Sequence, residues 1–196
     1  QPLRRYGAGC RDSERIAGIL KSINFKKALN PQKASLVIIN FCSVRQSALD
    51  RAAAKLKELS TLKGKPLIAT GCILEKNKKL VKTFANMFLP IDEINKLPEI
   101  LSGFGFKIKK EKTNNSHYLK LKPAYQSKII AYIPIMTGCN NFCSYCVVPY
   151  TRKREVSRPM QDIIKEAKEL ISNGTKEIWL LGQNVNSYKY KNYSFA

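Results

Sequence analysis

Short apolar runs that alternate with helical patterns constrain the fold of this chain more than any other feature. Residues 36–41 and 66–70 are continuous apolar runs of the kind seen in strands buried on both faces, and residues 129–136 and 176–181 predict two further strands. Helix-forming residues with apolar spacing fill 46–62, 75–84 and 159–172, and a further helix is expected to open at Asp12-Ser13-Glu14. This alternation predicts an α/β fold with parallel sheets.

The order of these elements predicts two domains. Residues 1–105 are expected to form an open parallel sheet with its helices. A Lys-rich, Asn-containing stretch at 106–127 is typical of a linker. Residues 128–196 then run strand, loop, helix, strand, which is the repeating unit of a βα barrel of the TIM type.

Three cysteines lie in the loop between the 129–136 strand and the 159–172 helix. Cys139, Cys143 and Cys146 form a C-x3-C-x2-C triplet, with no Cys or His after it to serve as a fourth ligand. Electron-transfer 4Fe–4S clusters and structural zinc sites each usually take four protein ligands. Three thiolates and an open position indicate a metal centre that binds a substrate.

The sequence around this triplet resembles the radical-SAM tRNA methylthiotransferases. The similarity runs from Gly138 through Val147-Val148-Pro149-Tyr150-Thr151-Arg152 and continues to Glu155-Val156-Ser157-Arg158-Pro159. A second match is Leu181-Gly182-Gln183-Asn184-Val185-Asn186-Ser187-Tyr188. Both favour the branch that acts on isopentenyl-modified adenosine beside the anticodon, where it adds a methylthio group to the adenine ring.

The resemblance implies a flavodoxin-like methylthiotransferase domain, a partial radical-SAM barrel, and two 4Fe–4S clusters with S-adenosylmethionine (SAM) as cofactor. Cys139, Cys143 and Cys146 would hold the radical-SAM cluster, whose open iron takes the methionine part of SAM. Tyr145 would pack beside the adenine of SAM, with ordinary loop packing as the alternative.

A second cluster is implied in the N-terminal domain. Cys42 and Cys72 each follow a predicted strand, at the sheet edge where open α/β sheets bind ligands. Their settings resemble two family ligands, although the residues alone would favour buried structural cysteines. Cys10 lies two residues before Asp12, whereas the family cysteine lies six before. Either a short deletion has moved Cys10 into that role, or the second cluster lacks a ligand.

Five polar side chains near the predicted site have weaker assignments. Arg152, Arg154 and Arg158 would bind the SAM carboxylate or tRNA phosphates, or are solvated surface residues. Gln183 and Asn184, at the end of the second barrel strand, would contact SAM or substrate, or cap the following loop. His117 is expected to be exposed without a role, and Trp179 to lie in the core.

The charge balance agrees with an anionic partner without proving one. Thirty-five Lys and Arg against fourteen Asp and Glu give a net charge of +21. Such a charge favours polyanions, yet scattered solvated lysines would produce it too. The resemblance implies tRNA as partner, with a flavodoxin or ferredoxin as electron donor. No run is long enough to span a membrane and no signal peptide is visible, so we expect a cytoplasmic protein.

Relatives of this family continue well beyond the equivalent of Ala196, and the chain begins with Gln rather than Met. We therefore expect a sequence truncated at both ends. Three alternatives to an active enzyme stay open at this point. They are an inactive relative, an iron–sulfur electron carrier, and a zinc-stabilised RNA-binding module.

Overall fold

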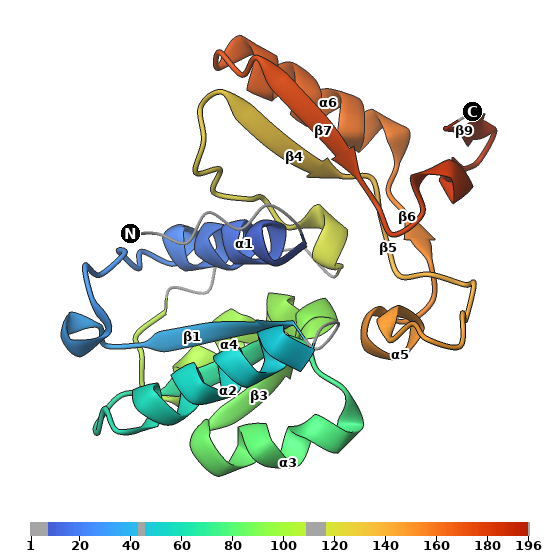
Figure 1. Ribbon diagram of the computed structural model, residues 1–196. Helices are drawn as coiled ribbons and strands as arrows, with labels where there is room; N and C mark the ends of the chain where they lie inside the picture. The colour runs from blue at the N-terminus through green and yellow to red at the C-terminus, as the bar shows by residue number, and fades with distance from the viewer. Residues whose placement is uncertain (1–7, 43–45, 109–116, 196) are drawn as a thin grey trace. The chain divides into compact units, whose positions relative to one another are not determined.

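The computed structural model describes residues 8–42, 46–108 and 117–195 (Figure 1). Its contacts divide the chain into two compact units, residues 1–124 and 125–196. Both are α/β, as the sequence predicts. The three-part division at 105 and 127 stays a prediction.

A parallel sheet of three strands is the centre of the first unit. Its order is β1 (Val37–Cys42), β2 (Leu67–Cys72) and β3 (Met87–Pro90). The first crossover contains α2 (Gln46–Ser60), and the second contains α3 (Glu75–Phe84). The third strand was not predicted. It has only four residues and is followed at once by a helical turn, so it shows no clear strand pattern in the sequence.

Side-chain alternation along β1 and β2 sends apolar residues to both faces of this sheet. Ile39, Phe41 and Ala69 pack on one face with side chains of α2 and α3. Ile38 and Ile68 pack on the other face, which is covered by α1 (Ala8–Ser22) and α4 (Leu97–Gly103). This burial on both faces explains why the strands are continuous apolar runs.

Residues of the predicted linker help to complete the core on the face of the sheet that α1 and α4 cover. The helical turn η2 (Ile91–Lys96) precedes α4, and η3 (Tyr118–Lys120) lies further along the chain. Tyr118, Leu119 and Leu121 are buried with the apolar face of α1. Part of the predicted linker is therefore core material of the first unit.

His117 differs from its prediction as an exposed residue without a role. It is half-buried, and its Nδ1 accepts a hydrogen bond from the N–H of Leu119 at 3.2 Å, which caps η3. Burial and the positive charge of Lys120 lower the pKa of His117, and Asp92 opposes them weakly.

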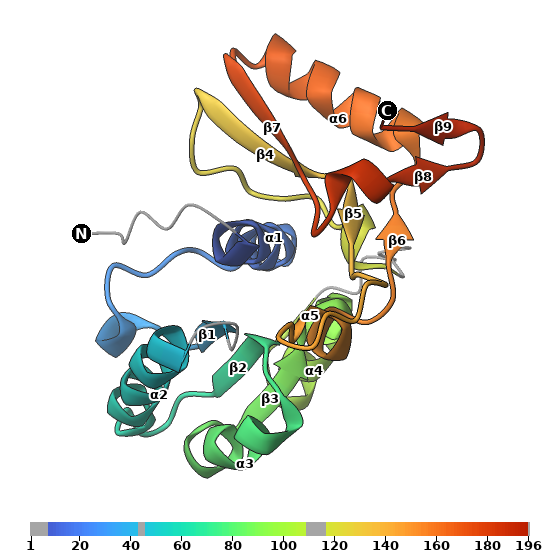
Figure 2. The ribbon, with the colours of Figure 1, turned by 45° about the vertical axis from the view of Figure 1, so that its right-hand side comes forward.

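The second unit is built on two parallel strands, β4 (Ile130–Pro134) and β7 (Glu177–Leu181), connected through α6 (Met160–Ser172). Figure 2 shows α6 lying along one face of this strand pair. Ala131, Ile133 and Leu170 form the core between them. This is the predicted βα barrel unit.

The prediction that Trp179 lies in the core is wrong, because α6 covers only one face of this sheet. Tyr132 and Trp179 are register partners on the other face, with ring centroids 6.5 Å apart. Trp179 is 52% exposed.

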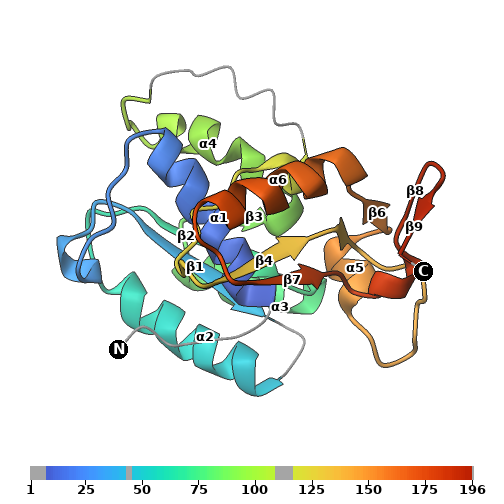
Figure 3. The same cartoon turned by 90° about the horizontal axis from the view of Figure 1, so that it is seen from above.

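The shorter elements of this unit lie beyond the carboxyl ends of β4 and β7, as the view from above in Figure 3 shows. Their bounds are β5 (Met136–Thr137), α5 (Val148–Arg152), β6 (Val156–Ser157), η4 (Val185–Ser187), β8 (Lys189–Tyr190) and β9 (Tyr193–Ser194), with η1 (Pro31–Lys33) in the first unit. β5 pairs antiparallel with β6, so the chain leaves β4, forms the cysteine loop and returns beside its starting point. No helix within the described ranges is long and apolar enough to cross a membrane.

Candidate metal centre and its supporting residues

The cysteine loop lies between β5 and α5, immediately beyond the carboxyl end of β4. Barrel enzymes place their reactive groups at this end of the strands. The antiparallel β5–β6 pair closes the base of the loop, with Thr137 opposite Val156. The sequence predicted this position but not the antiparallel pair that fixes it.

Backbone contacts at Gly138 and Cys139 close the loop further. The N–H of Cys139 donates to the carbonyl of Lys153 at 3.2 Å. Gly138 has φ +78, and a Cβ built on it would lie 2.1 Å from the carbonyl oxygen of Arg154. Only glycine fits here, because the position needs both a left-handed backbone and an empty Cβ site.

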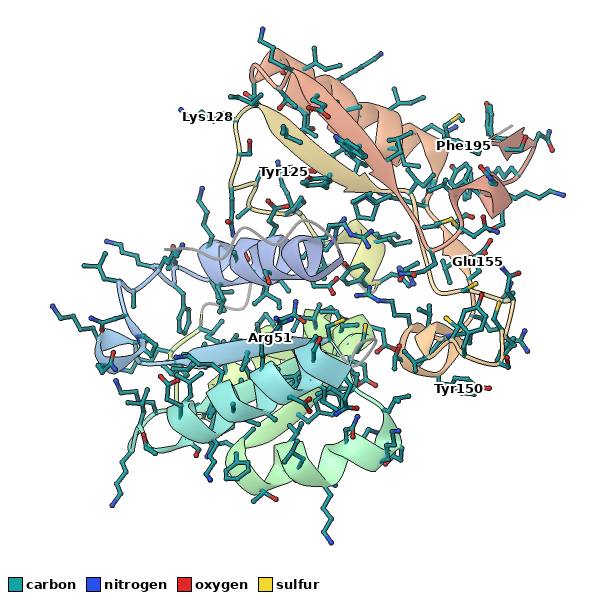
Figure 4. The ribbon with its side chains drawn as sticks, viewed as in Figure 1. Arg51, Tyr125, Lys128, Tyr150, Glu155 and Phe195 are labelled. Atoms are coloured by element: carbon teal, nitrogen blue, oxygen red, sulfur yellow. The ribbon has the colours of Figure 1, made fainter. Side chains whose placement is uncertain are left out.

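Side chains that the sequence reasoning missed fasten the loop to its surroundings. The Oδ1 of Asn140 accepts a hydrogen bond from the N–H of Glu155 at 3.1 Å. The carboxylate of Glu155 accepts one from the hydroxyl of Ser187 at 2.7 Å. Figure 4 labels Glu155 beside the loop and Tyr150 on the outer side of α5. These bonds join residues 15 and 32 positions apart, so no local pattern could have indicated them.

All three cysteines of the loop are half-buried free thiols. The N–H of Cys146 donates to the carbonyl of Cys143 at 2.9 Å, which turns the chain between these two positions. Among the residues that the structure describes, no three His, Cys, Asp or Glu side chains already converge on a metal position. Convergence of the thiols would therefore accompany metal binding.

Aromatic and cationic side chains border these cysteines. Tyr145 is 88% exposed, and its hydrogen bond with Cys143, together with the charge of that group, raises the pKa of its phenol. Phe142 adopts φ 47, a strained conformation for a residue with a Cβ. The guanidinium of Arg154 lies 4.9 Å from the centroid of the Phe142 ring, and Tyr150 meets the same ring edge-on at 6.0 Å.

The three arginines singled out from the sequence have different surroundings. Arg158 forms a buried ion pair with Glu166, which also accepts a hydrogen bond from the hydroxyl of Tyr125. Arg158 is therefore neither a solvated surface residue nor free to bind an anion. Arg152 is buried in α5, and Arg154 is exposed.

Gln183 and Asn184 lie two and three residues after the end of β7. Gln183 is exposed, whereas Asn184 immediately precedes η4 and its carbonyl accepts hydrogen bonds from the N–H and the hydroxyl of Ser187. The side chain of Asn184 makes no capping bond. Both residues lie at the carboxyl end of a barrel strand, where their assignment to SAM or substrate stays a prediction.

The structure brings Cys42 and Cys72 together. They are the last residues of β1 and β2 and are register partners, so their backbones lie about 4.8 Å apart. Cys72 packs with the residues under α1. Asn40, two residues before Cys42 and so on the same face, lies 3.4 Å from the hydroxyl of Ser13 on α1. Both cysteines therefore lie on the face that α1 covers.

Cys10 lies in the first turn of α1, which begins at Ala8 rather than at the predicted Asp12. Figure 1 shows this end of α1 above the end of the sheet where β1 stops. The side chain of Cys10 falls outside the described residues. The backbone thus places Cys10 at the end of α1 that lies near the carboxyl end of β1. Its role as a ligand stays a prediction.

Both sets of cysteines suit an iron–sulfur group in donor chemistry. Thiolate sulfur is the ligand that iron–sulfur clusters take, and Cys42, Cys139, Cys143 and Cys146 are free thiols. The residues present therefore fit the clusters that the sequence predicted.

Comparison with known proteins agrees with both halves of this description. Residues 7–89 match the uncharacterized protein family UPF0004, and residues 133–195 match the radical SAM superfamily. The chain is 39% identical over 197 residues to the tRNA-2-methylthio-N(6)-dimethylallyladenosine synthase of Clostridium perfringens, and 41% identical over 193 residues to the synthase of that name from Syntrophomonas wolfei.

These matches cover 92% and 91% of this chain but only 44% and 42% of the relatives, so it spans a little under half of their length. The two matched regions occur in the same order as the two units of the fold. The chain belongs to the radical-SAM methylthiotransferase family.

Proposed function

We propose that this chain carries the cluster-binding parts of an enzyme that adds a methylthio group to dimethylallyl-modified adenosine in tRNA. The relatives named for that reaction support the substrate, at 39% to 41% identity. The activity would belong to the complete protein in which these two units act.

The observation that carries the proposal is the register of Cys42 and Cys72. A radical-SAM unit alone would account for Cys139, Cys143 and Cys146 and for nothing in the first unit. Two cysteines paired at the carboxyl ends of neighbouring parallel strands, under the helix that bears Cys10, suit a second thiolate-ligated group. A sulfur-inserting enzyme of this family needs such a second group.

In the second unit, the three thiolates of the loop would hold one cluster, and Tyr145, Arg152, Gln183 and Asn184 would line the position of SAM or substrate. The reduced cluster, when bound, supplies the electron that cleaves SAM. The chain's own contribution is to orient the thiolates: Gly138 permits the tight closure of the loop, and Asn140 and Glu155 hold its two ends in register.

The test is a reaction with the complete protein that contains these two units, reconstituted anaerobically with iron and sulfide. An anticodon stem-loop RNA that carries dimethylallyladenosine is incubated with SAM and a low-potential reductant, and the RNA is digested and analysed by mass spectrometry. We expect methylthio-modified adenosine with the complete wild-type protein and none with its Cys139→Ala/Cys143→Ala/Cys146→Ala variant.

A matched RNA with unmodified adenosine at the same position tests the substrate assignment. Equal modification of both RNAs would contradict the dimethylallyl preference. Cleavage of SAM with no change in either RNA would contradict the proposed reaction while leaving the radical-SAM cluster intact.

A further inference from the structure

Helix α3 carries a concentrated positive charge that the cluster chemistry does not use. Its ten residues, Glu75–Phe84, include four lysines and one carboxylate. Helical geometry places Lys78, Lys79 and Lys82 on one side, with Lys76 beside them. From Lys76 to Lys82 this basic face extends about 9 Å along the helix axis.

Most of this charge is not neutralised. Lys78 pairs with Glu75 at 2.6 Å, and its ammonium lies 5.9 Å from the centroid of the Phe88 ring. Lys76, Lys79 and Lys82 are exposed and have no carboxylate partner in the part of the chain that the structure describes. Three ammonium groups thus stay available to an anion.

The same face is hollowed. A depression of about 410 Å³ is lined by Glu75, Lys78, Lys79, Lys82 and Thr83, all from α3. Its lining is polar, with no aromatic or aliphatic side chain to take an apolar ligand or stack a base. A surface of this kind suits phosphate groups bound by charge alone.

The position of α3 in the fold connects this face with the predicted chemistry. The helix begins at Glu75, three residues after Cys72, so its first turn starts from the carboxyl end of the sheet. An extended polyanion bound along α3 would therefore run past the sheet edge that holds the paired cysteines.

We propose that Lys76, Lys79 and Lys82 bind the sugar–phosphate backbone of the RNA substrate. This inference rests on the proposed function for the identity of the RNA, and it adds the surface by which the first unit holds it. Lysine ammonium groups would contact the phosphates and not the base edges, so they would position the RNA without selecting its sequence.

The test compares two triple variants of the complete protein with equal loss of charge. Lys76→Ala/Lys79→Ala/Lys82→Ala removes the basic face. Lys165→Ala/Lys168→Ala/Lys176→Ala removes three exposed lysines of the second unit. Binding of an RNA anticodon stem-loop is measured by fluorescence anisotropy across a range of salt concentrations, and circular dichroism verifies that both variants are folded.

Each lost phosphate contact lowers the slope of log affinity against log salt by roughly 0.7–0.9. We expect the α3 variant to lose about 2 to 3 from that slope and to bind at least about tenfold more weakly near 0.1 M salt. The second-unit variant should change affinity by less than about threefold.

Equal losses in the two variants would overturn the inference, since net charge alone would then explain binding. An unchanged α3 variant alongside a wild-type chain that binds RNA would overturn the inference and leave the proposed function standing. A complete wild-type protein with no affinity for the RNA would overturn both.

Discussion

Replacement of Gly138 by alanine tests whether the base of the cysteine loop is as tightly closed as the structure indicates. The residue has φ +78, and its missing side chain faces the carbonyl of Arg154. The new Cβ would lie 2.1 Å from that oxygen and 2.5 Å from its carbonyl carbon. Both are backbone atoms, so no side-chain rotation can relieve the clash.

Two costs add at this position. An L-residue in the left-handed region costs about 1–2 kcal/mol. A methyl group forced into occupied space costs typically about 1–3 kcal/mol more, because the backbone has to move. We therefore expect Gly138→Ala to lower the free energy of unfolding of the second unit by about 2–5 kcal/mol.

Gly174 provides the matched control in the same unit. It has φ +91 and no atom within 4 Å of its Cβ position, so Gly174→Ala carries the backbone cost without the clash. Trp179, the single tryptophan of the chain, lies on β7 and reports unfolding of the second unit by its fluorescence. Urea titrations of the three proteins give the comparison directly.

The result that would refute this reasoning is a Gly138→Ala variant no less stable than Gly174→Ala. A second readout follows from the bond between the N–H of Cys139 and the carbonyl of Lys153. Displacement of the backbone at Lys153 and Arg154 would disturb this bond and with it the position of Cys139. Gly138→Ala should therefore retain less iron after reconstitution, while Gly174→Ala should retain the wild-type amount.

Two further predictions concern buried charge. Glu166→Ala leaves the guanidinium of Arg158 buried and unpaired, which should destabilise the second unit by about 3–5 kcal/mol in urea titrations; a loss below about 1 kcal/mol would contradict the buried pair. The pKa of His117 is lowered in the folded protein, so as the pH drops below about 6.5 the unfolded chain binds the proton more readily than the folded one. The free energy of unfolding therefore decreases as the pH is lowered. His117→Asn should flatten this acid-side decline in thermal unfolding followed by circular dichroism between pH 7 and 5, and an unchanged slope would show that other groups cause it.

Periodicity and composition predicted the elements whose signals are local. The bounds of α3 agree with its apolar spacing, and the parallel pairing of β1 with β2 follows from two buried runs joined through a helix. The same reasoning predicted that Cys42 and Cys72 would share a sheet edge. Their register at the last position of each strand needed the structure.

Long-range packing decided what the sequence could not predict. Trp179 occupies an apolar strand but faces away from α6, since a strand pair covered on one face buries only alternate residues. The bonds that Asn140 and Glu155 make across the loop depend on the β5–β6 pair, whose strands are two residues each. Strands that short carry no periodicity to detect.

Iron content per chain tests the central claim, that the two units each hold an iron–sulfur cluster. After anaerobic reconstitution we expect about eight irons per wild-type chain, and about four in Cys139→Ala/Cys143→Ala/Cys146→Ala and in Cys42→Ser/Cys72→Ser. About four irons in the wild type that vanish with the loop cysteines would contradict a cluster in the first unit. Zinc in place of iron would contradict the account as a whole.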